Sequence, residues 1–463
     1  MKRLIVVSNR VTPSDEGDAS AGGLAVAVLA ALKQRGGLWF GWNGKTCQGT
    51  DPNPEIVKTG SLTFATLPMP EPDFDLYYNG YANRSLWPLF HYRTDLAFFD
   101  HNFFEAYLRI NGLFTTKLLP FLKEDDLIWI HDYHLIPMGQ YLRDAGMKQP
   151  IGFFLHTPFP AMEILLTLPN HKSLVKSLCA YDLVGFQSTG DLRAFHDYIV
   201  HEAGGEIFEN GVVRAFGHTM LARVFAISID TKTIAQQSIR AIRTKAVNRL
   251  KKSLNERVLI IGVDRLDYSK GLAQRFRAYE RLLRHYPENL NQVVFLQIAP
   301  PSRTEVPEYV NIRHELETLA GNINGYFAEF DWIPVRYLNK GYTMQRLAGF
   351  YRIGRVGLVT PLRDGMNLVA KEFVAAQNPA DPGVLVLSRF AGAAQELTEA
   401  LIVNPFDVDD LSNAIQRAIT MPLEERRKRW GAMMETLKKN DIFSWRDSFL
   451  SELEKAPATL EGA

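Results

Sequence analysis

Residues 356–377, VGLVTPLRDGMNLVAKEFVAAQ, decide the fold class of this chain. The apolar run at 356–362 predicts a buried strand, and the segment from Asn367 predicts a helix. Asp364 and Glu372 therefore lie on either side of a strand-to-helix turn. Such a turn exposes backbone N–H groups that bind anions, and ionised carboxylates accept hydrogen bonds from sugar hydroxyls. The turn indicates a nucleotide-sugar site; an Asp N-cap with a solvated Glu372 is the alternative.

The same alternation of apolar strands and helical segments recurs along the chain and predicts an α/β fold with parallel sheets. A length of 463 residues is too great for one ordinary core, so we expect two domains. Ligands of such sheets bind beyond the carboxyl ends of the strands. The predicted strands are 3–9, 126–136, 149–160 and 181–187, then a second set that begins near 257 and includes 292–303, 356–362 and 383–392.

The segment 228–245 lies between the two sets of strands and predicts the domain boundary, with a first domain at 1–230 and a second at 231–440. Residues 22–37 predict a helix, and 422–455 predict a helix-rich, charged C-terminal region. The segment 45–75 is rich in Pro, Thr and Asp and predicts irregular surface or short strands.

Composition excludes several function classes. The chain has 52 basic and 51 acidic residues, so its net charge of +1 gives no nucleic-acid footprint and no polybasic membrane anchor. No apolar run approaches the length of a membrane span, and the N-terminal apolar stretch is too short for a signal peptide. Cys47 and Cys179 are too few and too far apart for a disulfide or metal framework, which favours a cytoplasmic location.

Cations follow two of the predicted strands. The motif DRLDYSKG (264–271) places Arg265 and Lys270 on a strand-to-helix loop, where two cations suit a diphosphate and stabilise a leaving nucleoside diphosphate. Surface cations near an ordinary helix cap are the alternative. Arg10 and Arg303 also stand just beyond strands and could bind a second phosphate, although a lone arginine there is more often solvated. The Gly22-Gly23 pair before a helix allows close backbone approach of a ligand, or forms a simple turn.

Aromatic residues concentrate in LYYNGY (76–81) and LWPLFHYR (86–93), and flat rings line sugar sites well. Ordinary core packing is an equal alternative for most of them. Three other motifs do not support a function. No G-x-G-x-x-G is present, which disfavours a dinucleotide oxidoreductase, and Gly44-Lys45-Thr46 lacks the spacing of a phosphate-binding loop. The D-x-D triplets at 73–75 and 407–409 match a metal-binding pattern, but such triplets are common in polar loops.

Together these segments closely resemble the trehalose-6-phosphate synthase family, the retaining glycosyltransferases of family 20. The resemblance covers roughly residues 1–455 and is carried by SNR…AGGL, LWFGW, YYN, LWPLFHYR, IWIHDYHL, GFFLHTPFP, DRLDYSKG, PSR, LVTPLRDGMNLVAKE and SRFAGAAQEL. It implies two Rossmann-like domains facing a central cleft, the GT-B fold, with the acceptor in the N-terminal domain and the nucleotide sugar in the C-terminal domain. It further implies a helix at 441–463 that crosses back to the N-terminal domain.

The resemblance implies transfer of glucose from UDP-glucose to glucose 6-phosphate with retention, giving α,α-trehalose 6-phosphate and UDP. It implies no metal and no cofactor, since Arg265 and Lys270 supply the countercharge. A homo-oligomer is left open. A sister synthase that uses another phosphorylated acceptor, such as glycerol 3-phosphate, and a non-catalytic regulatory subunit are the alternatives. A non-catalytic regulatory subunit should have lost Arg265, Lys270 or Glu372, and all three are present.

The resemblance also assigns residues. Arg265 and Lys270 would hold the diphosphate, and Asp364 and His156 the donor glucose. The rest of the donor site would be Gly22, Gly23, Tyr342, Leu368, Val369, Ala370, Lys371 and Glu372, with Glu372 on the ribose, and the acceptor pocket would be Arg10, Tyr78, Trp87, Asp132 and Arg303. The sequence departs from the family pattern at four positions. Ala226 and Ser228 stand where the family usually has Pro and Gly, and Thr157 stands where it has Ile. Tyr342 stands where a Phe is common near the base, and this change bears on nucleotide preference.

Overall fold

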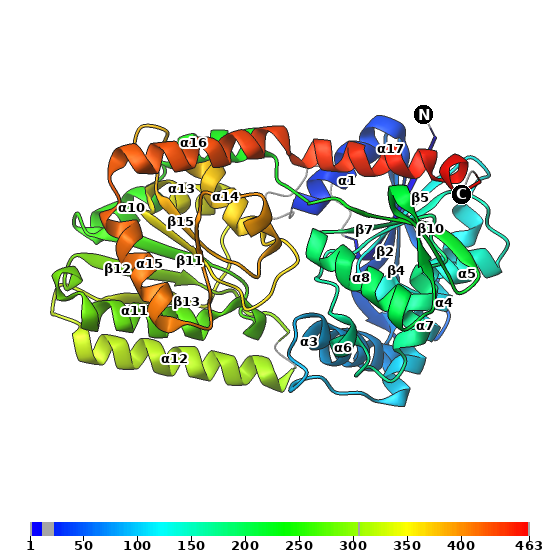
Figure 1. The fold of residues 1–463 in the computed structure, drawn as a ribbon, viewed down its shortest axis with the longest axis horizontal. Coiled ribbons are helices and arrows are strands. Elements are labelled where there is room, and N and C mark those ends of the chain that lie inside the picture. Colours follow the sequence, from blue (N-terminus) through cyan, green and yellow to red (C-terminus); the bar gives the residue numbers. More distant parts are fainter. Residues whose placement is uncertain (1, 12–22, 304–305, 462–463) are drawn as a thin grey trace. The chain divides into compact units, whose positions relative to one another are not determined.

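The computed structural model describes residues 2–11, 23–303 and 306–461 (Figure 1). Its described residues form two compact units. Unit 1 comprises residues 1–226 and 443–463, and unit 2 comprises residues 227–442. Each unit is built around its own largely parallel sheet, so the predicted α/β class is confirmed.

The sheet of unit 1 has ten strands in the described chain, in the order β3-β4-β2-β1-β5-β6-β7-β10-β9-β8. Pairing is parallel from β4 to β10 and antiparallel for β3, β9 and β8. From β1 the chain continues to β2 on one side and later to β5 on the other, so β1 and β5 form a topological switch point. The strands are β1 Leu4–Arg10, β2 Gly37–Cys47, β3 Glu55–Thr59, β4 Leu62–Pro70, β5 Leu127–His131, β6 Ile151–Phe154, β7 Leu183–Phe186, β8 Glu206–Ile207, β9 Val212–Ala215 and β10 His218–Val224.

Two strands of unit 1 end earlier than the sequence predicted. The strand predicted at 126–136 ends at His131, because Asp132 has a φ of 75° and a 3₁₀ turn, Tyr133–Leu135, follows it. The strand predicted at 149–160 ends at Phe154, shortly before two prolines, which lack the N–H that a strand ladder needs.

The helices of unit 1 include η1, a π-helix that runs directly into α3; together the two carry most of the aromatic residues noted in the sequence. The C-terminal helix α17 packs Phe449 against the sheet, and Gly152 and Gly185 make room, since a Cβ at either would lie 2.8 Å from that ring. The helices are α1 Gly23–Arg35, α2 Glu71–Phe74, η1 Asp75–Leu86, α3 Trp87–Phe90, α4 His101–Leu118, α5 Met138–Asp144, α6 Met162–Leu165, α7 His171–Leu178, α8 Thr189–His201 and α17 Ile442–Glu461.

The sheet of unit 2 has six described strands, all parallel, in the order β13-β12-β11-β14-β15-β16. The chain runs outward from β11 to β13, then returns to β14 beside β11 and runs outward to β16. The carboxyl ends of β11 and β14 are therefore the switch point where ligands of such sheets bind. The strands are β11 Val258–Val263, β12 Val293–Ile298, β13 Val335–Leu338, β14 Val356–Val359, β15 Val384–Ser388 and β16 Leu401–Val403.

Helices cover both faces of the unit 2 sheet. Helices α9, α10, α13, α14 and α16 contact one another on one face, and α11 contacts α12 and α15 on the other (Figure 1). Their bounds are α9 Thr231–Ala241, α10 Lys245–Leu254, α11 Leu272–His285, α12 Pro307–Phe327, α13 Met344–Ile353, α14 Leu368–Ala376, α15 Val408–Thr420 and α16 Leu423–Lys439. Across both units, the described chain contains no helix with the length and apolar character that crossing a bilayer requires.

Candidate active site

The two loops that leave the switch point of unit 2 touch each other. Leu362 donates its N–H to the carbonyl oxygen of Ser269, at 2.8 Å. Gly271 has a φ of +63°, and a Cβ there would lie 2.1 Å from the carbonyl oxygen of Thr360. Only glycine allows this approach at a left-handed residue. The loop after β11 is thereby fixed against the loop after β14.

This contact brings Lys270 and Asp364 together, 94 residues apart in sequence. Lys270 Nζ lies 2.5 Å from Asp364 Oδ2, and both side chains are largely buried. Asn367 donates from Nδ2 to the same carboxylate oxygen at 3.0 Å. Charge-assisted bonds of this length hold both groups in place. Two residues predicted for the donor site thus form one preorganised pair at the strand ends.

A second ion pair, between Arg275 and Asp264, holds the backbone of the loop that carries Lys270. Arg275, which is fully buried, donates to Asp264 Oδ2 at 2.7 Å, to Thr360 Oγ1 at 2.8 Å and to the Lys270 carbonyl oxygen at 3.1 Å. Asp264 also accepts from Asn367 Nδ2 at 3.2 Å. Our sequence reasoning missed Arg275. The available signal was its place beside Leu272 and Tyr279 on the apolar face of α11, where a charge needs a buried partner.

Arg265 and Arg303 meet at a third carboxylate. Asp267 is fully buried, and its Oδ2 lies 4.0 Å from Arg265 NH2 and 3.7 Å from Arg303 NH1. The side chain of Arg265 is half exposed, whereas that of Arg303 is only 7 % exposed. Arg303 is therefore not the solvated surface arginine that a lone strand-end cation would suggest.

The N-terminus of α14 opens beside these charges. Asn367 precedes the helix with a φ of 68° and makes no side-chain cap. The Ala370 N–H donates to the Asn367 carbonyl oxygen, and the Leu368 and Val369 N–H groups are in position to bind acceptor atoms of a ligand. Leu368 and Val369 are half-buried, and Ala370 is buried.

Lys371 and Glu372 belong to the buried face of α14. Lys371 is fully buried and donates to Glu396 Oε2 at 2.5 Å and to the Ile227 carbonyl oxygen at 2.7 Å; burial lowers its pKa. Burial also raises the pKa of the Glu372 carboxyl to about 7, and the nearby Asp264 adds to the rise. The Tyr351 hydroxyl lies 3.5 Å from Glu372 Oε2.

Tyr342 lies before α13. Its ring packs edge-on against Phe350, with 5.5 Å between the ring centroids. Lys340 Nζ and the Arg346 guanidinium lie 5.6 Å and 5.5 Å from the Tyr342 ring centroid. The ring is half-buried.

In unit 1, the acceptor candidates lie along a run of rings. Arg10 is exposed at the end of β1, and its guanidinium lies 5.7 Å from the Trp42 ring centroid. The rings continue through Tyr78, His134 and Tyr133 to Trp87, with neighbouring centroids 4.0 to 6.0 Å apart. We call Trp42, Tyr78, Trp87, Tyr133 and His134 the aromatic frame. Tyr78 and His134 are half-buried within it, whereas Trp87 is buried.

His156 and Asp132 lie at the ends of neighbouring strands. The His156 backbone N–H donates to Asp132 Oδ1 at 3.2 Å, and His131 Nδ1 lies 3.1 Å from His156 Nε2. Burial lowers the pKa of His156 to about 3 and that of His131 well below its usual value. Both imidazoles are therefore neutral near pH 7, and one ring donates to the other.

Several other motifs find different roles or fall outside the described chain. Gly22 lies outside the described residues, and Gly23 is the first residue of α1. In the D-x-D triplets, Asp73 pairs with Arg109, Asp407 caps α15, and Asp409 pairs with Arg281. Within residues 2–11, 23–303 and 306–461, no three metal-binding side chains gather.

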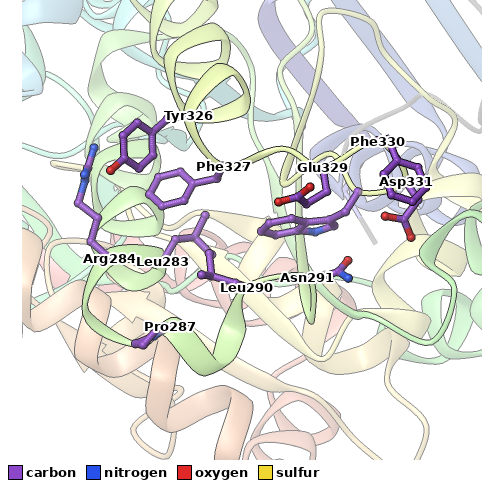
Figure 2. Close-up of a pocket in the computed structure, with 11 residues that line it drawn as sticks. Leu283, Arg284, Pro287, Leu290, Asn291, Tyr326, Phe327, Glu329, Phe330 and Asp331 are labelled. Carbon is purple, nitrogen blue, oxygen red and sulfur yellow. The ribbon is translucent and has the colours of Figure 1, made fainter.

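A hollow of about 930 Å³ lies elsewhere in unit 2 (Figure 2). Its lining includes residues 290–291 and 327–332, which precede β12 and β13, so it lies at the amino ends of the strands, opposite the switch point. The Arg284 guanidinium covers the Tyr326 ring there, 4.5 Å from its centroid, as Figure 2 shows. This hollow is separate from the charged loops.

Comparison with known proteins assigns the chain to a family. Residues 2–455 match the model of glycosyltransferase family 20. The chain belongs to this family. Trehalose-6-phosphate synthase of Escherichia coli (strain K12) is 50 % identical over 456 residues, which cover 98 % of this chain and 96 % of that protein.

Solved structures of family 20 proteins match along nearly the whole chain. An α,α-trehalose-phosphate synthase (UDP-forming) from Burkholderia xenovorans, in complex with glucose 6-phosphate, is 52 % identical with a TM-score of 0.94 and covers 98 % of this chain and 100 % of that one. The E. coli protein bound with UDP-2-fluoro glucose is 48 % identical with a TM-score of 0.94, covering 98 % and 99 %. These matches confirm the predicted GT-B class.

Proposed function

We propose that this family 20 chain transfers glucose from UDP-glucose to glucose 6-phosphate, giving α,α-trehalose 6-phosphate and UDP. The observation that carries the proposal is the Lys270–Asp364 pair, fixed beside Arg265 and the open N-terminus of α14 at the switch point of unit 2. A glycosyltransferase with a diphosphate leaving group needs cations and N–H donors in this arrangement. Near-half identity to a trehalose-6-phosphate synthase over the whole chain supports the same substrates.

In the proposed reaction, unit 2 holds the nucleotide sugar. Arg265 and Lys270 neutralise the diphosphate as charge develops on it, and the α14 N–H groups at Leu368 and Val369 bind acceptor atoms of the nucleotide. Asp364 accepts hydrogen bonds from glucose hydroxyls, and its contact with Lys270 couples the sugar and diphosphate positions. Glu372 binds the ribose. Because these groups are fixed before the substrate arrives, they cost little reorganisation in the transition state.

The proposed acceptor site takes the glucose 6-phosphate ring against Tyr78 and Trp87, with its phosphate on Arg10 and Arg303 and a hydroxyl on Asp132. His156 is neutral at pH 7 and its Nε2 is engaged by His131, so it contacts the donor glucose through Nδ1. The departing phosphate deprotonates the acceptor hydroxyl on the same face of the sugar, so the α configuration is retained. The glucose 6-phosphate in the B. xenovorans structure and the UDP-2-fluoro glucose in the E. coli structure are consistent with these substrates.

The test is product identification. The purified protein is incubated with UDP-, GDP- or ADP-glucose and with glucose 6-phosphate or glycerol 3-phosphate, and the product linkage is read by NMR. We expect α,α-trehalose 6-phosphate from UDP-glucose, with activity unchanged by EDTA. A β-linked product, or activity with glycerol 3-phosphate alone, would contradict the proposal. If EDTA abolished the activity and added metal restored it, the D-x-D triplets would again be candidates for a metal site.

A cytoplasmic location is part of the proposal. It is supported by Cys47 and Cys179, which are both free thiols in the structure. Self-association is left to measurement.

A further inference from the structure

Asp267 occupies an unusual position between two cations that the proposed function assigns to different substrates. Its carboxylate is fully buried, and the same oxygen, Oδ2, lies 4.0 Å from Arg265 NH2 and 3.7 Å from Arg303 NH1. Asp267 Oδ1 accepts the Ser269 N–H at 3.0 Å, which caps the 3₁₀ turn carrying Lys270. One rigidly held carboxylate therefore contacts both arginines and orients the loop of the third cation.

Tyr309 completes the arrangement from α12. Arg303 NH1 donates to the Tyr309 hydroxyl at 2.6 Å, and that hydroxyl donates to Asp267 Oδ2 at 3.0 Å. A phenol can do both, because it has one proton and accepts at its lone pairs. Tyr309 is 1 % exposed, and burial raises the pKa of its hydroxyl, so the proton remains in place.

The backbone of Arg303 has a strained conformation, which indicates that the surrounding contacts hold the residue in place. Arg303 has a φ of +49°, a conformation that costs a non-glycine residue on the order of 1 kcal/mol or more. Its N-terminal neighbours are an irregular loop after β12, and its carbonyl oxygen accepts from Val306 N at 3.0 Å. The side chain is nevertheless nearly buried against Tyr309 and Asp267. The Arg303–Tyr309–Asp267 chain is thus a specific polar network within unit 2.

We propose that Tyr309 and Asp267 are positioning residues: Tyr309 orients Arg303 toward the acceptor phosphate, and Asp267 holds Arg303 and the donor cation Arg265 from a single carboxylate. The proposal rests on the function proposed above. Two guanidinium groups that serve two anionic substrates repel each other before the substrates bind. A buried carboxylate between them offsets this repulsion and fixes both, so each phosphate meets an arginine already in place.

Tyr309→Phe tests the acceptor half of the proposal. It removes one hydroxyl and should raise the KM for glucose 6-phosphate roughly tenfold, the size expected for a bond to a charged group. The kcat and the KM for UDP-glucose should stay within about twofold, since Arg265 and Lys270 are untouched. Tyr279→Phe is the matched control, because Tyr279 is equally buried in unit 2 but donates to the carbonyl oxygens of Val293 and Pro334. It should leave the KM values of both substrates unchanged.

A double-mutant cycle distinguishes positioning from general damage. If Tyr309 acts through Arg303, Tyr309→Phe should have no further effect in an Arg303→Ala background and its full effect in an Arg265→Ala background. An equal loss in both backgrounds, or an equal rise in the UDP-glucose KM, would overturn the proposal. Unfolding temperatures of all variants are measured alongside.

Asp267→Asn tests the shared carboxylate and serves as the second variant if Tyr309→Phe does not fold. Asparagine keeps an oxygen for the Ser269 N–H but loses the negative charge. We expect a roughly tenfold rise in the glucose 6-phosphate KM together with a roughly tenfold lower kcat. A change in only one of the two parameters would refute a shared role for Asp267.

Calorimetric titration separates this inference from the proposed function. Glucose 6-phosphate and UDP are titrated separately into the wild type, Tyr309→Phe and Asp267→Asn. If the wild type makes no trehalose 6-phosphate, the proposed function fails, but weaker glucose 6-phosphate binding by Tyr309→Phe with unchanged UDP binding would still support the network. Unchanged glucose 6-phosphate binding by both variants would overturn the inference even in an active enzyme.

Discussion

The switch points of the two units present different chemistry at the same place in the sheet. Beyond β11 and β14 of unit 2, charged side chains hold one another: Lys270 with Asp364, and Arg275 with Asp264. Beyond β1 and β5 of unit 1, Arg10 lies on the aromatic frame. A diphosphate needs fixed charge, whereas a sugar ring is recognised by flat, partly apolar surfaces. The comparison teaches that the carboxyl ends of parallel strands can suit a diphosphate or a sugar ring, depending on the loops that follow them.

The two regions should also respond differently to substitution. A buried charge that loses its partner is costly, so changes in the unit 2 network should reduce both stability and turnover. Tyr78 is half-buried and Arg10 is exposed, and in the described part of the chain neither is paired with a buried charge. Changes there should alter acceptor binding and leave stability nearly intact. The predictions below test this contrast.

The largest effect is expected at Lys371. Lys371→Met removes the fully buried cation from the largely buried Glu396, which keeps only its contact with Asn440 among the described bonds, and this should lower the free energy of unfolding by about 3 kcal/mol in urea denaturation. Lys371→Met combined with Glu396→Leu should recover most of the loss, because an apolar pair of similar volume replaces the ion pair. A single-variant loss below about 1 kcal/mol would mean that unit 2 does not depend on its buried charges.

Lys270→Ala should mainly reduce turnover. It removes a cation from the departing diphosphate and leaves Asp364 with Asn367 alone among the contacts described above. Loss of one such contact costs on the order of 3 kcal/mol in the transition state, or about a hundredfold in kcat. Steady-state kinetics with UDP-glucose measures it. A raised donor KM with unchanged kcat would show that Lys270 binds ground state and transition state equally.

Glu372 should make unit 2 less stable as the pH rises. Its folded pKa of about 7 exceeds the ordinary value of 4.5. Between these values the unfolded chain ionises while the folded carboxyl keeps its proton, so stability present below pH 4.5 is lost progressively up to pH 7. The loss should be about 3 kcal/mol.

The measurement for Glu372 compares urea unfolding of the ligand-free wild type and Glu372→Gln between pH 4.5 and 8. The glutamine variant cannot ionise, so the difference between the two proteins should change with pH in this window. Parallel stability curves would show that burial does not hold the carboxyl in its protonated form.

The sequence predicted the charged edge of unit 2 well, for a clear reason. Arg265, Lys270 and Asp364 each follow an apolar run, and parallel strands bring their carboxyl ends to one edge of a sheet. The sequence could not show which charges pair, because the Lys270–Asp364 contact depends on the neighbouring positions of β11 and β14. Asp264 and Asp267 lie in the DRLDYSKG motif, and their partners Arg275 and Tyr309 lie on helices. The apolar face of α11 signals that Arg275 is buried, but periodicity does not show which carboxylate each partner meets.

The aromatic frame was less predictable. A Trp or Tyr in a sequence is compatible with a core position or a sugar site, and the structure contains both situations. Trp87 is buried beside Tyr133, while Tyr78 is half-buried against Trp42. The π-helix η1 that presents Tyr78 contains Gly80 and two asparagines, which do not favour helix, so tertiary packing overrides local propensity there.

Arg10→Ala should raise the glucose 6-phosphate KM about tenfold and leave kcat within about twofold, because the acceptor phosphate does not change charge during transfer. Arg10 is exposed and packs on Trp42, so the unfolding temperature should hardly change. Kinetics at varied acceptor concentration with a parallel thermal melt tests both points. A hundredfold fall in kcat would make Arg10 equivalent to Lys270 and remove the contrast between the two switch points.

The smallest effect is expected at Tyr342, which we propose lies near the nucleotide base. Its ring packs edge-on against Phe350 and lies near Lys340 and Arg346, contacts that depend on the ring and not on the hydroxyl. Tyr342→Phe keeps them, so the KM for UDP-glucose should stay within about twofold. Tyr342→Ala removes the ring and should raise that KM several-fold, since a stacked or edge-on ring contributes about 1 kcal/mol. Kinetics with UDP-, GDP- and ADP-glucose would measure both variants. If Tyr342→Phe changed the order of preference among the three donors, the hydroxyl would be reading the base, and unit 2 would select its nucleotide through a polar contact and not through ring packing.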